Sequence, residues 1–394
     1  MNRIKMITND LLIILLALVS LAILLLNTGT VLLVIAIFLS SLLIVINLKQ
    51  IKWYFLFLLI ANVLSCVCTL LFYKGTGVVL IFLTLLMLCL VVNFVSFSKK
   101  ARRCVYLIGA ASILLLVLTA NSISFSVNWL VLHDSYGRLV NNNTLGMYSV
   151  AFGFCLLLWN ELRKGKKFKK LFSVIIYIVS FVCACITGCR SAMFVLVLYF
   201  VLHKFIKKDL KIKSFRCIVI LIFAVSLLFT GFYVILYTVV PNATILGKSL
   251  FSGRESVWSL AFSQILKSPL FGTGTDYLMG EFESTHNMLL GILKNLGLIP
   301  LISIMISFII YKRVYISRKQ QIMVISFCIF AFFETFMMDL RFLFLFVFLM
   351  AGTNEVKLSK TEKSKQTGSD LQTKEFVESG ETVQIEEGVK TNDT

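Results

Sequence analysis

Long runs of apolar residues set the strongest limit on what this chain can fold into. A run of about 20 apolar residues spans a bilayer as a helix. Twelve runs here reach or approach that length, in a chain with 59% hydrophobic residues and a mean hydropathy of +0.93. The sequence therefore predicts an all-α, polytopic integral membrane protein with about twelve transmembrane helices, at 8–27, 30–48, 53–73, 77–97, 104–121, 144–160, 171–188, 191–206, 217–240, 296–313, 321–337 and 340–353. A single long tilted helix over 286–313 is an alternative for the tenth span.

Positive charge is divided unevenly between the two ends of these spans. Lys and Arg gather at the N-terminus, near 49–52 and 99–103, and in the loops 163–170, 204–216 and 312–319. Cytoplasmic loops of membrane proteins carry such an excess. The pattern predicts that both termini are cytoplasmic. Including six lysines of the C-terminal tail, it accounts for all but eight of the 38 Lys and Arg: Lys74, Arg138, Arg190, Lys248, Arg254, Lys267, Lys294 and Arg341.

The net charge of +19 thus follows from topology and gives no reason to expect nucleic acid as a partner. The N-terminal segment is interpreted as a retained first helix, because no small-x-small cleavage pattern precedes Asn27. Residues 354–394 are polar, and we expect a disordered cytoplasmic tail there, behind a transmembrane domain at 1–353. A dispensable solubilising end is the plainer interpretation of that tail. No internal repeat is evident.

The ten cysteines and three histidines show no pattern of a metal or redox site. There is no CxxC pair, no HExxH and no DxD, and most cysteines fall within apolar runs. Cysteines in such positions behave as small buried residues. We therefore expect no metal and no cofactor.

The longest polar segment on the non-cytoplasmic side, about 241–295, predicts a large outer loop between the ninth and tenth spans. Ser252 and Glu255 form a capping-box pattern that predicts a helix, whose amphipathic sequence through Leu266 suits the outer membrane surface. Arg254 then stands at a helix N-terminus, where free N–H groups favour an anion. Gly272-Thr273-Gly274 is interpreted as a structural turn.

Two further outer residues are candidates for catalysis. Arg190 follows the seventh span, and its guanidinium suits a phosphate; an arginine that snorkels to lipid headgroups is the alternative. His286 lies where the chain re-enters the membrane, and histidine is readily poised as a base near neutral pH, although a hydrogen-bonded structural histidine is equally familiar. Asn143 offers amide groups to sugars or phosphates, or caps a helix. Glu334, Asp339 and Arg341 lie around the last outer hairpin, where mutual ion pairing is the default explanation.

These residues resemble the O-antigen polymerase and ligase family of bacterial membranes. The resemblance rests on Thr187-Gly188-Cys189-Arg190, on Asn143-Thr144-Leu145-Gly146, and above all on one cluster in the large outer loop. That cluster comprises Gly253, Arg254, Trp258, Pro269, Gly272, Gly274, His286 and Asn287. Cys189 departs from the serine frequent in the family.

The resemblance implies a GT-C-like membrane glycosyltransferase that acts on undecaprenyl-diphosphate-linked oligosaccharides at the outer leaflet, as a Wzy-type polymerase of a capsular or O-antigen type polysaccharide. On this basis we expect metal-independent catalysis by His286, Arg254 and Arg190. Flippase and chain-length regulator proteins are the expected partners beside membrane lipid. The expected substrate-binding residues are Asn143, Arg138, Glu255, Trp258, Asn287, Glu334 and Arg341.

Two other functions remain open. A ligase of the same family transfers glycan to a different acceptor, and sequence separates it poorly from a polymerase. A transporter or lipid-linked oligosaccharide flippase also has many helices, but transporters place polar groups near the bilayer midplane. Here the charged residues gather at the outer edge, which favours an enzyme.

Overall fold

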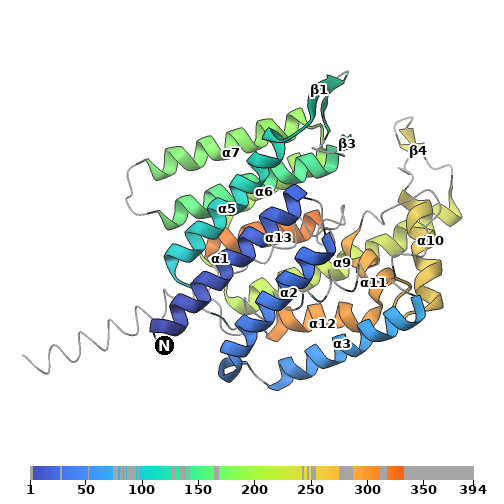
Figure 1. Cartoon of the computed structure of the whole chain (residues 1–394). Coiled ribbons are helices and arrows are strands. Elements are labelled where there is room, and N and C mark those ends of the chain that lie inside the picture. The colour runs from blue at the N-terminus through green and yellow to red at the C-terminus, as the bar shows by residue number, and fades with distance from the viewer. Residues whose placement is uncertain are drawn as a thin grey trace, which may run out of the picture. The chain divides into compact units, whose positions relative to one another are not determined.

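The computed structural model describes residues 3–26, 29–51, 53–73, 97–126, 129–133, 139–140, 142–163, 168–241, 244–245, 248–249, 254–274, 287–310 and 317–331, with single positions at 79, 83, 86 and 95. Helices make up most of the described chain (Figure 1). They are α1 (Arg3–Leu26), α2 (Gly29–Ile46), a 3-10 turn (Leu48–Gln50), α3 (Trp53–Tyr73), α5 (Lys99–Leu118), α6 (Asn142–Leu162), α7 (Lys169–Ile186), α8 (Arg190–Phe205), α9 (Ile212–Val239), α10 (Arg254–Lys267), α11 (Met288–Leu296), α12 (Leu298–Ile310) and α13 (Arg318–Phe330).

Helices occupy most of the described residues in the predicted spans. Among the described residues, five stretches, within α1, α5, α6, α7 and α9, are long and apolar enough to cross a membrane. The full count of twelve stays a prediction, because the span at 77–97 is described only at isolated positions and the span at 340–353 lies outside the described residues, as does the tail at 354–394.

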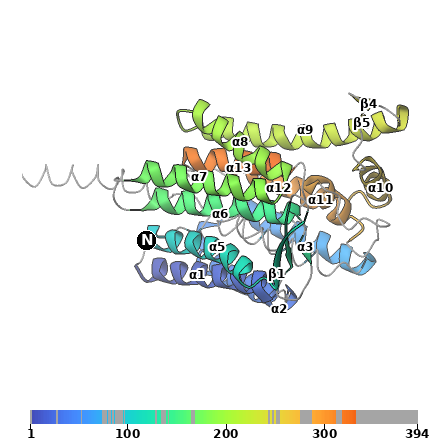
Figure 2. The same ribbon diagram turned by 90° about the horizontal axis from the view of Figure 1, so that it is seen from above.

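The packing of α6 against α7 is typical of helices in a membrane. On α7 the inward face carries small residues such as Ser180 and Ala184, while Ile178 and Val182 on the outward face are exposed. Gly153 of α6 lies so close that an added Cβ would meet the Ser180 Oγ at 2.2 Å. Small residues allow such close approach where lipid covers the outer face. Figure 2 shows α1, α5, α6 and α7 running side by side and α9 extending toward α10.

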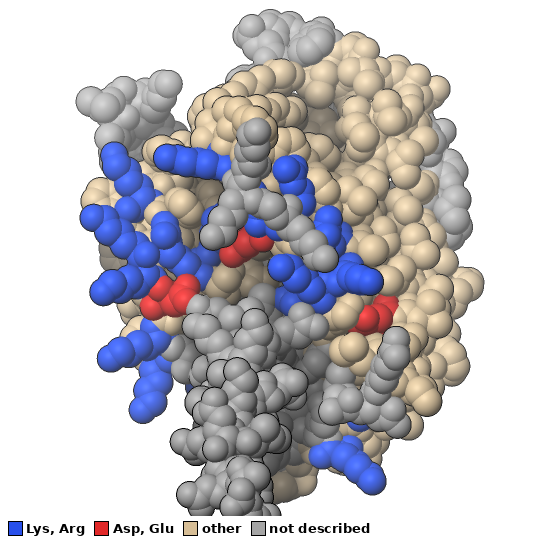
Figure 3. All heavy atoms as spheres, turned by 90° about the vertical axis from the view of Figure 1, so that its left-hand side faces the viewer, with Lys and Arg blue, Asp and Glu red and all other residues tan. Residues whose placement is uncertain are grey.

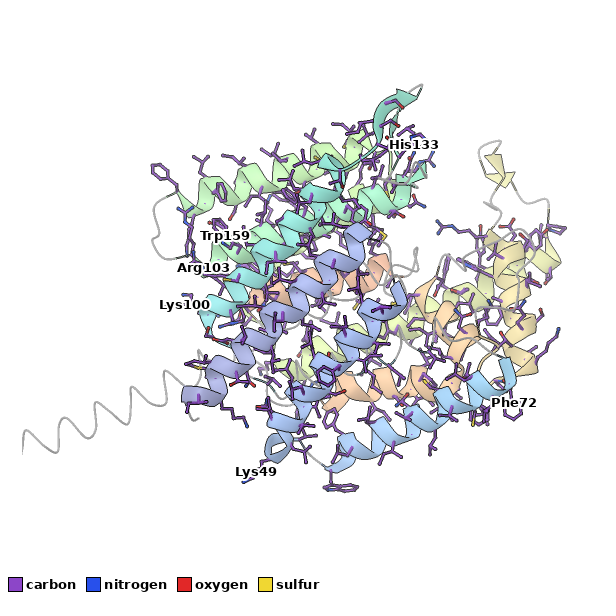
Figure 4. All side chains as sticks on the ribbon, in the orientation of Figure 1. Lys49, Phe72, Lys100, Arg103, His133 and Trp159 are labelled. Atoms are coloured by element: carbon purple, nitrogen blue, oxygen red, sulfur yellow. The ribbon has the colours of Figure 1, made fainter. Side chains whose placement is uncertain are left out.

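Basic side chains gather over one end of the helices (Figure 3). Figure 4 shows Lys49, Lys100 and Arg103 toward this end, and His133 and Phe72 toward the opposite end. The basic end is held together by polar contacts: the Arg318 N–H donates to the Asp209 carboxylate at 2.8 Å, and the Arg318 guanidinium donates to the His203 carbonyl. The shared basic end is the arrangement that the charge pattern predicts.

The chain is mostly helical, as predicted, and two small antiparallel sheets lie in its loops. Strands β1 (Ser122–Ser126), β2 (Trp129–His133) and β3 (Leu139–Val140) form a sheet in that order. Strands β4 (Thr244–Ile245) and β5 (Lys248–Ser249) form a hairpin. The first sheet follows from local alternation, since Ser and apolar residues alternate along β1 and fit a half-buried strand. The sheet lies between α5 and α6, in the connection 122–143 for which the sequence predicted no strands.

The alternative of one long helix over 286–313 is wrong. Gly297 adopts a φ of +85° and separates α11 from α12. A Cβ at this position would meet the Leu270 carbonyl oxygen at 2.2 Å, so a close backbone approach requires the glycine. The break lets the chain after α10 lie directly against the α11–α12 junction.

Candidate functional site

The two sequence elements around Asn143 and Arg190 meet in the structure. The Cys189 thiol lies 3.8 Å from the Asn143 carbonyl oxygen, and a Cβ on Gly146 would meet the Cys189 Cβ at 2.2 Å. Cys189 is fully buried at this contact of α6 with α8, whereas Arg190, the next residue, is exposed. A buried glycine–cysteine contact therefore holds the first turn of α6 against the start of α8.

The turn from α7 to α8 fixes where Arg190 stands. The Thr187 hydroxyl donates to the Ala184 carbonyl at 2.8 Å, and Gly188 takes a φ of +66° with its N–H bonded to the Cys185 carbonyl at 3.0 Å. A left-handed glycine after the last helical turn ends a helix without steric cost. Arg190 then becomes the first residue of α8, at the end opposite the basic face, because His203 near the other end of α8 contacts Arg318.

Arg254 is the first residue of α10, as the sequence predicts, although Ser252 of the expected capping box lies outside the described residues. The apolar face of α10 packs against protein: Val257, Trp258 and Ala261 form a buried cluster with Leu290 of α11. The Trp258 ring lies 5.3 Å from the Tyr233 ring of α9. This face is therefore covered by α9 and α11, which corrects the expectation that it faces the membrane surface.

Glu255 and Trp258, two predicted substrate-binding residues, are buried, with exposed fractions of 7% and 3%. Arg254 is partly exposed one residue earlier. Because an arginine at a helix start is oriented by what the helix packs on, these buried residues position Arg254 in the described structure. Direct contact of Glu255 or Trp258 with substrate stays a prediction.

The segment after α10 is fastened to α11 and α3. The Thr273 N–H donates to the Lys294 carbonyl at 2.7 Å and the Gly274 N–H to the Asn295 carbonyl at 3.0 Å. On the other side, the Thr69 hydroxyl of α3 donates to the Phe271 carbonyl at 2.6 Å. These bonds satisfy the last carbonyls of α11, which have no partner within the helix. The structural interpretation of the Gly-Thr-Gly segment is confirmed.

Asn287 has a structural position that the sequence did not reveal. Its side chain is completely buried; the Oδ1 accepts from the Leu290 N–H at 3.0 Å and the Nδ2 donates to the hydroxyls of Ser226 and Thr230 on α9. The residue therefore caps α11 and ties it to α9. We assign Asn287 to positioning, and its predicted contact with substrate is left as an expectation.

Four predicted site residues, His286, Arg138, Glu334 and Arg341, lie outside the described residues. Of these, His286 immediately precedes the anchored Asn287. Within the described part of the chain, no three His, Cys, Asp or Glu side chains come together as a group that could hold a metal ion. The expectation of a metal-free site stays a prediction.

Sequence reasoning missed three contributors to this region. Thr69 lies 202 positions before its partner Phe271, and no local pattern marks such a pair. Cys189 was noted only as a departure from serine, yet its burial against Gly146 fixes α8. Lys294 of α11 is only 6% exposed. A lysine within an apolar helix was the available signal for Lys294.

The apolar helices, their small-residue packing and the single basic end define a polytopic integral membrane protein. Residues 175–305, about a third of the chain, match a family model described as O-antigen ligase. This match supports assignment of the chain to the O-antigen polymerase and ligase family, whose members are glycosyltransferase-like enzymes. The matched segment contains Arg190, Arg254 and His286. No curated protein and no solved structure was found to match the chain.

Proposed function

We propose that this protein polymerises undecaprenyl-diphosphate-linked oligosaccharide repeat units into a capsular or O-antigen type surface polysaccharide, at the outer leaflet of a bacterial plasma membrane. The observation that carries the proposal is the family match over 175–305, which includes both outer-end arginines that begin α8 and α10. Lipid-linked oligosaccharide is the substrate class that the family implies.

The proposed reaction is a glycosyl transfer. The bond between the anomeric carbon and the diphosphate oxygen of one lipid-linked glycan breaks, and undecaprenyl diphosphate leaves with the bonding electrons. A hydroxyl of the terminal sugar on another repeat unit forms the new bond to that carbon and loses its proton to a base. The catalyst must therefore stabilise negative charge on the leaving diphosphate and accept one proton.

Arg190 and Arg254 are proposed to stabilise the diphosphate. Each guanidinium belongs to the first residue of a helix, so the free N–H groups of that turn add positive potential beside it. His286 is proposed as the base. Its chain neighbour Asn287 is held by hydrogen bonds to α9, which supports a fixed position for the start of α11.

The remaining sequence-based assignments complete the proposal. Two glycans must be oriented, and Asn143 at the α6–α8 contact is one residue proposed to do this. The others are Arg138, Glu255, Trp258, Glu334 and Arg341. No metal takes part, both termini are cytoplasmic, and residues 354–394 form a separate cytoplasmic tail. A flippase that delivers the substrate and a chain-length regulator are the proposed protein partners.

The test is complementation of a deletion strain, with lipid-linked and surface glycan resolved on gels. Replacement of Arg190 or Arg254 by alanine should abolish polymer, and single lipid-linked repeat units should accumulate on the outer side of the membrane. The variant protein should still be present in membranes. Lys204→Ala is the matched control, because Lys204 is an exposed cation at the other end of α8.

Each alternative has its own outcome in that test. Polymer of normal length from Arg254→Ala excludes the role of that arginine. Repeat units trapped on the cytoplasmic side of the deletion strain indicate a flippase, the transporter alternative. Normal polymer that is missing only from its final acceptor indicates a ligase.

A further inference from the structure

The β1–β2 hairpin (residues 122–133) presents a polar surface at the outer end of the molecule. Side chains alternate between the two faces of a strand, and directly paired residues share a face. Ser122 lies opposite His133, and Ser124 lies opposite Val131, so the two serines and the histidine share one face. Both serines are exposed and His133 is partly exposed. Leu132, on the other face, is completely buried.

The imidazole of His133 is held in place. The ring Nδ1 lies 2.9 Å from the Ser122 hydroxyl oxygen. The Asn121 N–H donates to the backbone carbonyl of His133 at 3.0 Å. His133 also pairs with Leu139 of β3, which leads into α6. The structure thus fixes an orientation for a side chain that is still partly accessible, which reduces the entropy lost when it binds a ligand.

The hairpin is continuous with the α6–α8 corner of the candidate site. Strand β2 lies against α6, and α6 begins two residues after β3 with the turn that carries Asn143. The carbonyl of Asn143 in turn lies next to Cys189, the residue before Arg190. A glycan whose diphosphate reaches Arg190 therefore lies at the same corner of α6 as the hairpin.

The chemistry of the hairpin selects a neutral ligand. Residues 121–133 contain no Lys, Arg, Asp or Glu, although the whole chain carries a net charge of +19. A face that binds phosphate or anionic lipid headgroups needs cations. Hydroxyl and imidazole groups instead donate and accept hydrogen bonds as sugar hydroxyls do.

We propose that the polar face of the β1–β2 hairpin, formed by Ser122, Ser124 and His133, is a saccharide-binding surface that holds the uncharged sugars of the oligosaccharide repeat unit. This inference rests on the proposed function for the identity of the glycan. It assigns sugar binding to the loop between α5 and α6, outside the segment that matches the family model.

The probe is the free oligosaccharide released by mild acid from lipid-linked repeat units that accumulate in the deletion strain. Without lipid or diphosphate, its binding depends on sugar contacts alone. Its Kd for the full-length protein in nanodiscs is measured by ligand-detected NMR. Each of Ser122→Ala, Ser124→Ala and His133→Ala should raise the Kd about fivefold per hydrogen bond lost. Ile123→Ala, from the neighbouring position on the other face, should leave it unchanged.

Turnover of the intact lipid-linked substrate, measured in parallel, separates the two proposals. The hairpin variants should raise KM and keep kcat within about twofold of wild type. An unchanged Kd in all three variants overturns the saccharide surface. This holds whether the variants have a normal kcat, a lower kcat with a displaced pH profile, or a changed oligomeric state. If wild type binds the free oligosaccharide through His133 but does not polymerise the lipid-linked substrate, the proposed function is overturned and the saccharide surface stands.

Discussion

At the scale of single residues, glycines decide how closely the helices around the candidate site approach. Gly146 leaves no room for a Cβ beside Cys189, whereas Gly231 of α9 has nothing within 4 Å of the same position. Two glycines within apolar helices therefore differ in whether a larger side chain fits. The first brings the α6 and α8 starts together, and the second is free to change.

Gly146→Ala should destabilise the protein and reduce polymer formation. The new methyl group overlaps the Cys189 side chain, and overpacking of a dense core costs about 1–3 kcal/mol. Gly231→Ala is the matched control and should keep or slightly raise stability, because alanine favours a helix by about 1 kcal/mol over glycine. Thermal unfolding of the two purified variants checks this, and an equal Tm for both contradicts the contact.

At the scale of elements, α11 is short, and its position depends on its two ends. Asn287 joins its first turn to α9, and the hydrogen bonds from Thr273 and Gly274 close its last turn. A helix of nine residues has little stability of its own in water. These end contacts, together with the buried cluster around Trp258 and Leu290, define where α11 begins and ends.

Asn287→Ala should lower stability by about 1–3 kcal/mol, since it removes a helix cap and leaves two buried hydroxyls without their amide donor. Thr230→Val in the same background should cost less than it does in wild type, because the two side chains share a hydrogen bond of 3.1 Å. Denaturation of the two single variants and the double variant measures this coupling. Strictly additive losses would argue against the bond.

At the scale of the whole molecule, the helices separate two chemically different ends. Lys49, Lys100 and Arg103 lie toward the same end as the N-terminus, and His133 lies toward the other end (Figures 1 and 4). α5 connects them, with Lys99 at its first position and Leu118 at its last. The charge asymmetry therefore predicts that the basic end is cytoplasmic and that the hairpin end is on the other side of the membrane.

Reaction with a membrane-impermeant thiol reagent tests this orientation in cells. In a variant without its native cysteines, Ile123→Cys should react from outside, and Lys204→Cys should react only after the membrane is permeabilised. Both positions are exposed in the structure, so access depends on the membrane side alone. The reverse pattern would invert the topology and remove Arg190 from the outer face.

Much of the fold was predictable because its signals are local. Apolar length and the positions of Lys and Arg predict the helices and their common basic end, and Arg254 begins α10 as its flanking residues indicate. The strands of the hairpin escaped prediction, although Ser-Ile-Ser-Phe-Ser alternates, because a span-finding argument treats a short polar segment as a loop. The separate helix α11, ended at Gly297, was not predicted, because the sequence predicts an outer loop at 241–295 and a tenth span that begins at 296.

The sequence by itself determined the class of the protein, its common basic end and the residue types available for chemistry, since hydropathy and charge act through composition along a segment. Tertiary structure alone decided which of those residues meet. Contacts such as Thr69 with Phe271, Cys189 with Gly146, and Asn287 with Thr230 join positions from 43 to 202 apart. Such pairs depend on shape and hydrogen-bond geometry between helices, which no local pattern in one segment encodes.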